Sequence, residues 1–188
     1  MIRSLGDLHP QIAATAFVDE TAQVIGDVVI GEHASIWMHA VLRGDVCSIR
    51  IGDYTNIQDN CVLHVEEDIY SLTLEDHVTV GHGVLLHGCH IEPRCLIGMG
   101  AILLNNCRIG TGSIIAAGSI VPEHTVIPPR SMVTGVPGTV RRTITDADLA
   151  RIDDGLKAYF RLKERYLAEQ RRARHVALRQ PVGPRGGT

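Results

Sequence analysis

Aliphatic residues recur every six positions along most of this chain, from Val18 to Val133, with one step of five and two short insertions, at 46–50 and 65–72. The residue four positions after each aliphatic is small or slender. Helices repeat every 3.6 residues and strands every two, so neither produces this period. The pattern therefore predicts a solenoid of short parallel strands with a narrow interior. The aliphatic series consists of Val18, Val24, Ile30, Ile36, Leu42, Ile51, Ile57, Leu63, Leu74, Val80, Leu86, Ile91, Ile97, Leu103, Ile109, Ile115, Val121, Ile127 and Val133.

Hexapeptide repeats of this kind resemble the left-handed parallel β-helix, in which three hexapeptides form one triangular coil. The resemblance implies a mainly β protein. Gly and Asn supply the positive φ that its sharp corners require. Glycine also follows the aliphatic directly at five positions, which are Gly31, Gly52, Gly81, Gly98 and Gly110.

The pattern divides one domain into four segments. Residues 1–17 precede the repeat and are expected to form an N-terminal cap, which solenoids require. The β-helix is predicted over 18–140. Apolar residues at helical spacing after Thr145, which begins a capping box, predict a C-terminal α-helix over 141–172 that packs on the β-helix. The basic and then Pro/Gly-rich residues 173–188 are expected to be a flexible tail.

Composition narrows the class of protein. The chain of 188 residues holds seven aromatics beside 19 glycines, as a thin interior requires, and its net charge of −3 argues against nucleic-acid or anionic-membrane partners. No apolar run approaches transmembrane length and no signal sequence begins the chain, so a cytoplasmic location is expected. The odd count of five cysteines argues against a disulfide framework. Cys61, Cys95 and Cys107 belong to the small inward series and are interpreted as buried.

Two histidines are predicted to stack on one face. Side chains alternate along a strand, so the residue directly after an inward aliphatic points outward. This places Arg43, His64 and His87 on the same face of three successive coils, roughly 4.8 Å apart per coil. At that spacing two imidazoles can share one ion.

A third histidine belongs to the preceding face. His82 follows Val80 by two positions and stacks above Asp59. Faces of a triangular coil diverge by about 120°, so His82 should not meet the pair within one chain. A cyclic homotrimer would bring His82 of one subunit to His64 and His87 of the next.

Three neutral imidazoles with an open fourth position are the ligand set of a catalytic Zn²⁺. Such a metal lowers the pKa of its bound water to about 7 and so supplies hydroxide at neutral pH. The alternative is that these are three of the chain's ten histidines exposed at the surface. Two that stack and a third that symmetry brings to them favour the metal site.

At these residues the sequence resembles the γ-class carbonic anhydrases over about Leu8 to Leu167. The resemblance implies a homotrimer with metal between subunits, usually zinc, with Fe²⁺ or Co²⁺ as alternatives. It implies that His64, His82 and His87 are the ligands. The matching stretches are Ile36-Trp37, Arg43-Gly44-Asp45, Asn56-Ile57-Gln58-Asp59 through His64, Val80-Gly81-His82-Gly83 through His87-Gly88-Cys89, and Ile97-Gly98-Met99-Gly100-Ala101.

The resemblance also implies roles for other polar residues. Gln58 and Asn56 are expected near the metal hydroxide and CO2. An ion-pair network across the subunit interface is expected from Arg43, Asp45 and Asp59; the alternative is that they are solvated charges. Tyr159, on the C-terminal helix, matches a tyrosine that approaches the site in many relatives, although a core role is an equal alternative.

This chain departs from the archetypal enzyme at the residues for proton export. Val46 stands where that enzyme has a glutamate after its Arg-x-Asp, and the loop after His64 is short. Glu67 could be a substitute proton shuttle or a solvated loop acid. CO2 hydration to bicarbonate is the first hypothesis, and hydrolysis of an acyl-CoA thioester at the same metal is the second. A hexapeptide acyltransferase sharing only the fold, and a trimer without catalysis, are further alternatives.

Overall fold

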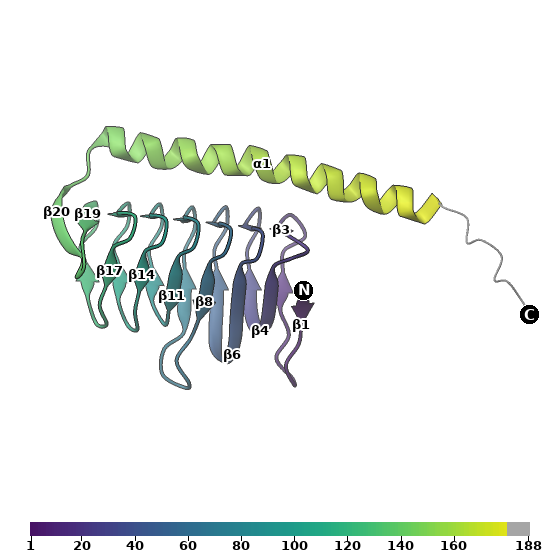
Figure 1. Ribbon diagram of the computed structural model, residues 1–188, viewed down its shortest axis with the longest axis horizontal. Helices are drawn as coiled ribbons and strands as arrows, with labels where there is room; N and C mark the ends of the chain where they lie inside the picture. The colour runs from purple at the N-terminus through teal and green to yellow at the C-terminus, as the bar shows by residue number, and fades with distance from the viewer. Residues whose placement is uncertain (180–188) are drawn as a thin grey trace, which may run out of the picture.

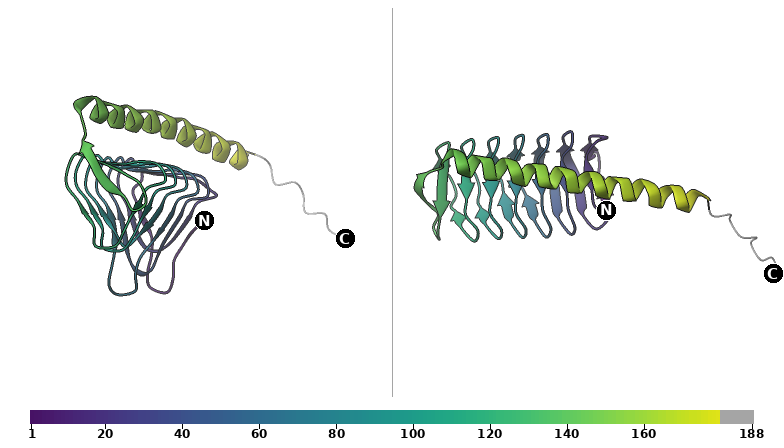
Figure 2. Two further views of the ribbon diagram at one scale, coloured as in Figure 1. Left: turned by 60° about the vertical axis from the view of Figure 1, so that its left-hand side comes forward. Right: turned by 90° about the horizontal axis from the view of Figure 1, so that it is seen from above.

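Residues 1–179 are described by a computed structural model, in which short strands wind into a β-helix and one long α-helix lies along it (Figure 1). Successive coils stack with parallel pairing and give a triangular cross-section (Figure 2). The predicted left-handed parallel β-helix with a C-terminal helix is confirmed. Its three faces are called A, B and C below.

Faces A and B form one 12-stranded sheet, because β4 (Gln23–Ile30) and β6 (Val41–Ile51) continue around the corner between them. Face A contains their first halves with β1 (Ile2–Arg3), β8 (Val62–His64), β11 (Leu85–His87), β14 (Ile102–Leu103) and β17 (Ile120–Val121). Face B contains their second halves with β2 (Gln11–Ile12), β9 (Leu72–Leu74), β12 (His90–Ile91), β15 (Arg108–Ile109) and β18 (Val126–Ile127).

Face C is a separate 8-stranded sheet. Its last strand runs antiparallel to its neighbour, unlike the rest. The strands are β3 (Phe17–Val18), β5 (Ser35–Ile36), β7 (Asn56–Ile57), β10 (Thr79–Val80), β13 (Leu96–Ile97), β16 (Ile114–Ile115), β19 (Ser131–Thr134) and β20 (Thr139–Thr143).

The two predicted inward series fill the interior. Residues such as Ile57, Leu63 and Leu86 are fully buried, and Cys61, Cys95 and Cys107 are buried with them. Burial raises the pKa of the Cys61 thiol to about 12. These cysteines are therefore apolar filling, as the sequence predicts.

The N-terminal segment does more than cap the first coil. β1 and β2 pair in parallel with the two halves of β4, so residues 2–12 extend faces A and B by a further turn. Ile2 and Leu5 remain about half exposed, at 53% and 48%.

The helix α1 (Asp146–Arg179) covers face C (Figures 1 and 2). It begins later than the expected residue 141 because 139–143 form β20. It also continues past residue 172, so the first part of the expected tail is helical. The remainder, 180–188, lies outside the described residues.

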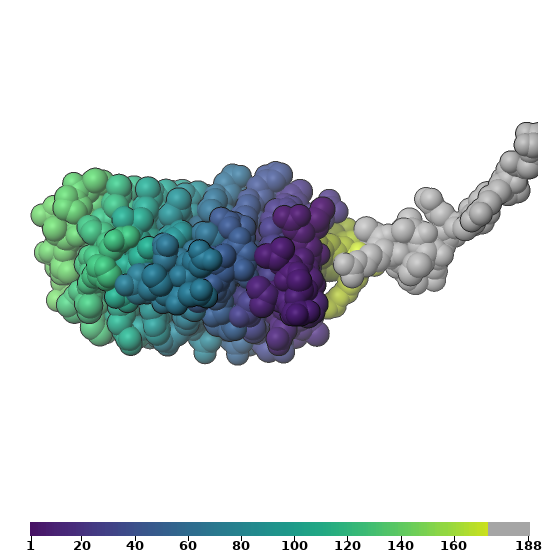
Figure 3. Space-filling model, turned by 90° about the horizontal axis from the view of Figure 1, so that it is seen from below, coloured from purple at the N-terminus to yellow at the C-terminus, as the bar shows by residue number. Residues whose placement is uncertain are grey.

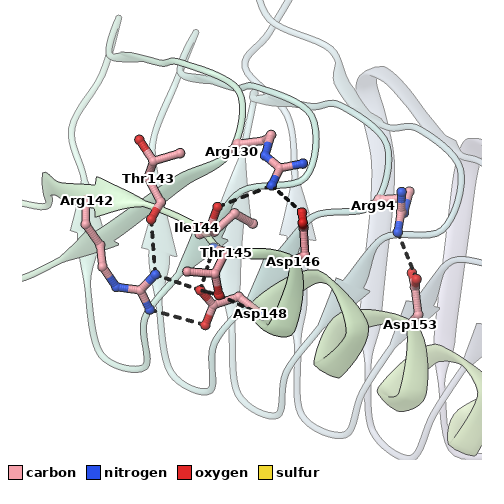
Figure 4. Close-up of polar contacts among 9 residues, drawn as sticks. All are labelled: Arg94, Arg130, Arg142, Thr143, Ile144, Thr145, Asp146, Asp148 and Asp153. Atoms are coloured by element: carbon pink, nitrogen blue, oxygen red, sulfur yellow. Dashed lines mark hydrogen bonds and ion pairs between the residues drawn. The ribbon is translucent and has the colours of Figure 1, made fainter.

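Ion pairs and a capping box fix the first half of α1 (Figure 4). Asp148 Oδ2 accepts hydrogen bonds from the backbone N–H and the hydroxyl of Thr145, both at 2.8 Å, and Thr145 Oγ1 accepts the N–H of Asp148 at 3.2 Å. Arg142 pairs with Asp148 at 2.6 Å. Two corner residues reach the helix as well, each at 2.8 Å, in the pairs Arg130–Asp146 and Arg94–Asp153.

Aromatic rings and one buried lysine hold the helix against face C. Trp37 packs edge-on to Tyr159 and Tyr166, with ring centroids 5.4 and 5.3 Å apart. Lys163 is fully buried and donates to the Thr15 carbonyl at 3.1 Å. The predicted amphipathic packing of the helix is confirmed.

The insertion at 65–72 projects on the side opposite α1, beside the N-terminal segment (Figures 1 and 3). Its two ends pair through an antiparallel bridge between Glu66 and Tyr70. No helix within residues 1–179 is long and apolar enough to cross a bilayer.

Candidate functional site

His64 and His87 are register partners on adjacent strands of face A, β8 and β11, as the alternation rule predicts. Their rings face each other, with Nδ1 of His64 and Nε2 of His87 only 3.0 Å apart. Both side chains are partly buried. The two imidazoles therefore form a preorganised pair at the edge of the face.

The outer nitrogen of each ring meets an acceptor oxygen. His64 Nε2 lies 3.0 Å from Asp45 Oδ1, and His87 Nδ1 lies 2.6 Å from Asn105 Oδ1. The Asn105 amide donates its own N–H to Glu66 Oε2 at 3.0 Å, which fixes the amide's orientation. Both outer nitrogens must consequently be the donors.

It follows that in the neutral imidazoles the two inner nitrogens are unprotonated and direct lone pairs at each other. Facing lone pairs at 3.0 Å repel unless a proton or a metal ion is shared between them. Two ligand nitrogens on a tetrahedral zinc are roughly 3.3 Å apart, given Zn–N distances of about 2.0–2.1 Å. The donor set and its spacing therefore fit a metal ion after a small opening of the pair.

Asp45 is held as a carboxylate by its partners. Burial of the side chain opposes ionisation, but hydrogen bonds from His64 and Arg43 outweigh it and hold the pKa of Asp45 below its usual range. Arg43 pairs with Asp45 in the same chain. A carboxylate behind a ligand histidine fixes the ring's tautomer and raises its basicity.

The structure adds Asn105 and Glu66 to this cluster, which sequence reasoning missed. Asn105 lies at the corner after β14, two residues past the inward Leu103. The six-residue period places Asn105 one coil beyond His87 along the solenoid axis. The period does not determine the side-chain rotamer, which turns Asn105 towards the ring of His87.

His82 lies in a second cluster, beside face C. Its Nδ1 is 2.7 Å from Asp59 Oδ2, and its Nε2 is 3.4 Å from the hydroxyl of Tyr159 on α1. Burial, and then the nearby charge of Asp59, raise the pKa of Tyr159 above its ordinary value, so the phenol stays protonated. Tyr159 contacts the buried Trp37 as well.

Asn56 and Gln58 are buried on the same side of the molecule, on or directly after β7. Gln58 Nε2 donates to Asn56 Oδ1 at 3.2 Å, and Asn56 Nδ2 donates to Thr79 Oγ1 at 2.9 Å. This chain of amides gives each side chain a fixed direction. Thr79, the last member, was not predicted.

The predicted site residues thus fall into two groups within one chain. Arg43, Asp45, His64 and His87 gather at face A. The other five, Asn56, Gln58, Asp59, His82 and Tyr159, gather at face C. In the part of the chain that the structure describes, no three metal-ligand side chains converge.

Glu67 lies near the first group but is exposed. It lines a hollow of about 550 Å³ together with Asp45 and Val46. Glu67 is therefore open to solvent and shares this hollow with Asp45, the partner of His64.

An apolar ladder runs along face A beside the histidine pair. It consists of register partners on successive strands that point outward and remain partly or largely exposed: Val41, Val62, Leu85, Ile102 and Ile120. Val62 and Leu85 are 42% and 37% exposed. The strip leaves apolar side chains in contact with solvent beside the two histidines.

Comparison with curated proteins gives relatives that include several named as carbonic anhydrases. The chain is 38% identical over 175 residues to "Gamma carbonic anhydrase 1, mitochondrial" of Arabidopsis thaliana, covering 90% of this chain and 64% of the plant protein. It therefore spans less than two thirds of that relative's length. It is 44% identical over 161 residues to "Carbonic anhydrase" of Geobacillus kaustophilus, covering 86% of this chain and 88% of that protein.

A family model and a solved structure also match the chain, and both are described with the word transferase or acetyltransferase. Residues 88–123 match the family described as "Bacterial transferase hexapeptide (six repeats)". A crystal structure from Bacillus cereus titled as a putative acetyltransferase superposes with a TM-score of 0.85 at 42% identity, covering 87% of this chain and 94% of that one.

Proposed function

The chain belongs to the γ-class carbonic anhydrase-like family of hexapeptide-repeat proteins, and we propose that it is a metal-dependent carbonic anhydrase converting CO2 to bicarbonate between subunits. The observation that carries the proposal is the His64–His87 pair, whose inner nitrogens lie 3.0 Å apart and whose outer nitrogens are both occupied by acceptors. A pair built in this way can share either a proton or a metal ion, and two imidazoles on adjacent coils match a zinc-type donor set.

The third ligand in this proposal is His82 of a neighbouring subunit in a homotrimer. The apolar ladder on face A supplies a surface for that neighbour, since it lies directly beside the two histidines. His82 is 45% exposed at its side chain and stands outside the face-A cluster of its own chain. An approaching subunit would therefore add His82, Asp59 and the Asn56–Gln58 amides to His64 and His87.

Zn²⁺, or Fe²⁺ or Co²⁺, would supply hydroxide at neutral pH by lowering the pKa of a bound water. This chain's residues would do the rest. Asp45 and Asn105 keep the lone pairs of His64 and His87 directed at the metal position. The amide of Gln58, held by Asn56, offers a fixed hydrogen-bonding group for orienting a small oxygen-bearing substrate. The hydroxyl of Tyr159, on α1, contacts Nε2 of His82 and would help to orient its imidazole.

The direct test is stopped-flow CO2 hydration on protein loaded in turn with Zn²⁺, Fe²⁺ and Co²⁺. We expect activity that follows metal content and falls to the buffer background in His64→Ala. His90→Ala is the matched control, because His90 is also outward, partly buried and paired with a carboxylate, but lies on face B. Background rates in the metal-loaded wild type would refute the proposal.

Chemistry on acyl-CoA thioesters is the second candidate activity, because a similar structure is described as an acetyltransferase. The same preparations should be given acyl-CoA thioesters with and without an amine acceptor. Thioester hydrolysis that depends on metal and on His64 would assign a hydrolase at this site. Acyl transfer that is independent of His64 would assign transferase chemistry elsewhere on the fold.

A further inference from the structure

A groove separate from the histidine pair lies between α1 and the corner where faces B and C meet. Its volume is about 380 Å³, within the roughly 300–1,000 Å³ typical of small-molecule sites. One wall is the corner of three successive coils, and the other is the helix between Asp153 and Arg161. Figure 1 shows α1 running along these corners.

Aromatic rings line both walls. Tyr54 stacks on His77 with centroids 5.1 Å apart and planes 11° apart, and on its other side His33 lies at 4.8 Å. Phe160 of the helix closes on the row, 5.8 Å from both His33 and Tyr54. Tyr54 and Phe160 are still 40% and 37% exposed. The faces of Tyr54 are covered by His77 and His33, and Lys163 Nζ lies 4.8 Å from the Phe160 centroid. The exposed parts of the two rings are therefore available for edge-to-face contact with a planar ligand, which is a favourable arrangement of aromatic rings.

The charge beside the groove is positive. Lys157 and Arg161 line its helix wall. The carboxylate of Asp153 is engaged by Arg94 at 2.8 Å, and Lys157 meets Asp154 only at 3.7 Å between largely exposed side chains. Among the side chains that the structure describes, Arg161 pairs with no carboxylate. A guanidinium beside exposed rings suits a carboxylate ligand.

From these features we propose that the groove binds a small planar aromatic carboxylate, with its ring against the exposed edges of Tyr54 and Phe160 and its carboxylate at Arg161. The inference is independent of the proposed carbonic anhydrase activity, because none of these three residues touches the histidine clusters. The groove does adjoin the cluster of His82, since Asn56 and Tyr159 are among the residues that line it.

The experiment is a fluorescence titration of the full chain with 2-naphthoate, checked by calorimetry, beside the neutral isostere 2-naphthalenemethanol. We expect saturable binding of one naphthoate per chain and binding of the alcohol at least about tenfold weaker. Arg161→Gln should raise the Kd for naphthoate about tenfold. Arg165→Gln is its control, one turn further along the same helix and outside the groove.

Tyr54→Gly tests the ring contact with little backbone cost, since Tyr54 has a φ of 57° and Gly112 takes the same corner on a later coil. His124→Gly is the control at a different corner, with a φ of 60°. We expect Tyr54→Gly to lose naphthoate binding and His124→Gly to retain it, with circular dichroism showing both folded.

Four results would overturn the proposal. The first is the absence of binding to the folded wild type at millimolar naphthoate. The second is equal affinity for the neutral alcohol. The third is binding that survives both Arg161→Gln and Tyr54→Gly. The fourth comes from adenosine monophosphate: if it binds through Tyr54 and Arg161 while naphthoate does not, the groove is a nucleotide site.

Discussion

At the scale of single residues, the candidate site depends on which nitrogen of each histidine carries the proton. Asp45 and Asn105 present only acceptor oxygens to the outer nitrogens of His64 and His87, and this leaves the inner nitrogens free for a cation. Asn105 is in turn oriented by Glu66. The same two histidines without these acceptors could rotate or exchange tautomers, and the pair would lose its preorganisation.

Asn105→Ala should therefore weaken metal binding without removing a ligand. Loss of a hydrogen-bonding partner behind a ligand histidine costs about 10–100-fold in metal affinity. Competition with a chromophoric chelator measures the change. Asn106→Gly is the matched control, because Asn106 lies at the same corner with a φ of 55° and bonds to His124 instead. Equal metal affinity in Asn105→Ala and Asn106→Gly would show that Asn105 does not orient His87.

Sequence alone was sufficient for the stacking of His64 and His87, and the reason is geometric. Each follows an inward leucine, and Leu63 and Leu86 are one coil apart once the insertion at 65–72 is set aside. The contact between His87 and Asn105 was not predictable, because Asn105 comes after the strand, at a corner, where alternation no longer applies. Periodicity determines position along the solenoid, whereas corner side chains depend on rotamer choice.

At the scale of elements, the repeat uses glycine for two different reasons. Gly98, directly after an inward isoleucine, lies so close to the next coil that a Cβ would be 2.5 Å from the backbone nitrogen of Ala117. Gly100, at the following corner, has open space but a φ of +66°. Glycine is required at position 98 because two backbones approach closely there, and at position 100 because the backbone there is left-handed.

This difference predicts unequal costs for the same substitution. Gly100→Ala should lower the free energy of unfolding by about 1 kcal/mol, the cost of a left-handed conformation for a residue with a Cβ. Gly98→Ala should cost about 3 kcal/mol, because neither backbone can move without separating two coils. Urea unfolding followed by circular dichroism compares the two. Equal losses would mean that the coils can separate freely at Gly98.

The start of the helix was predicted too early because the strand before it has no hydrophobic pattern. Residues 139–143 carry no alternation of buried and exposed positions, since all five are exposed, yet they pair as β20 with β19. Pairing by backbone hydrogen bonds leaves no hydrophobic signal in the sequence. The capping box at Thr145 was readable because it depends on two polar side chains at a fixed spacing.

Acid should loosen the start of α1 through Asp148. Hydrogen bonds from Arg142 and then from Thr145 hold the pKa of Asp148 well below its usual value. A carboxylate with a lowered folded-state pKa stabilises the fold above its unfolded pKa of about 3.9, and the stabilisation is lost as pH falls below that value towards the folded pKa.

The Tm of the wild type should therefore exceed that of Asp148→Asn by a constant amount from pH 7 to about pH 5, and the gap should narrow below about pH 4. Differential scanning fluorimetry across this range measures it. Asp154→Asn is the control, since Asp154 is on the same helix but has only a 3.7 Å contact with Lys157. A gap that stays constant down to pH 2 would show that the Asp148 contacts do not depend on its charge.

At the scale of the whole molecule, the two groups of site residues are complementary but separated by the shape of the β-helix. Face A carries two imidazoles and an apolar ladder, whereas the corner beside face C carries His82 with Asp59 and Tyr159. Within one rigid triangular solenoid these groups cannot approach each other. Only a second copy can complete the proposed metal site, and cyclic symmetry would then complete every site in the same way.

Mixing two defective chains tests this completion between subunits. Homotrimers of His82→Ala and of His87→Ala should each bind metal poorly, because every site lacks one ligand. In a cyclic trimer containing both variants, one interface pairs an intact His64–His87 face with an intact His82. Equal co-refolding makes about three quarters of the trimers mixed, so about a quarter of the wild-type metal content and activity should return.

A mixture of His64→Ala and His87→Ala is the matched control, because both variants damage the same face and no interface in their mixed trimers is intact. Metal content by mass spectrometry and CO2 hydration should then stay at the level of the separate variants. Subunit exchange is verified by purifying through a tag on one variant only. An arrangement that takes all three histidines from one chain predicts no recovery in either mixture. If tagged mixtures of His82→Ala and His87→Ala recover neither metal nor activity, His82 does not act across an interface.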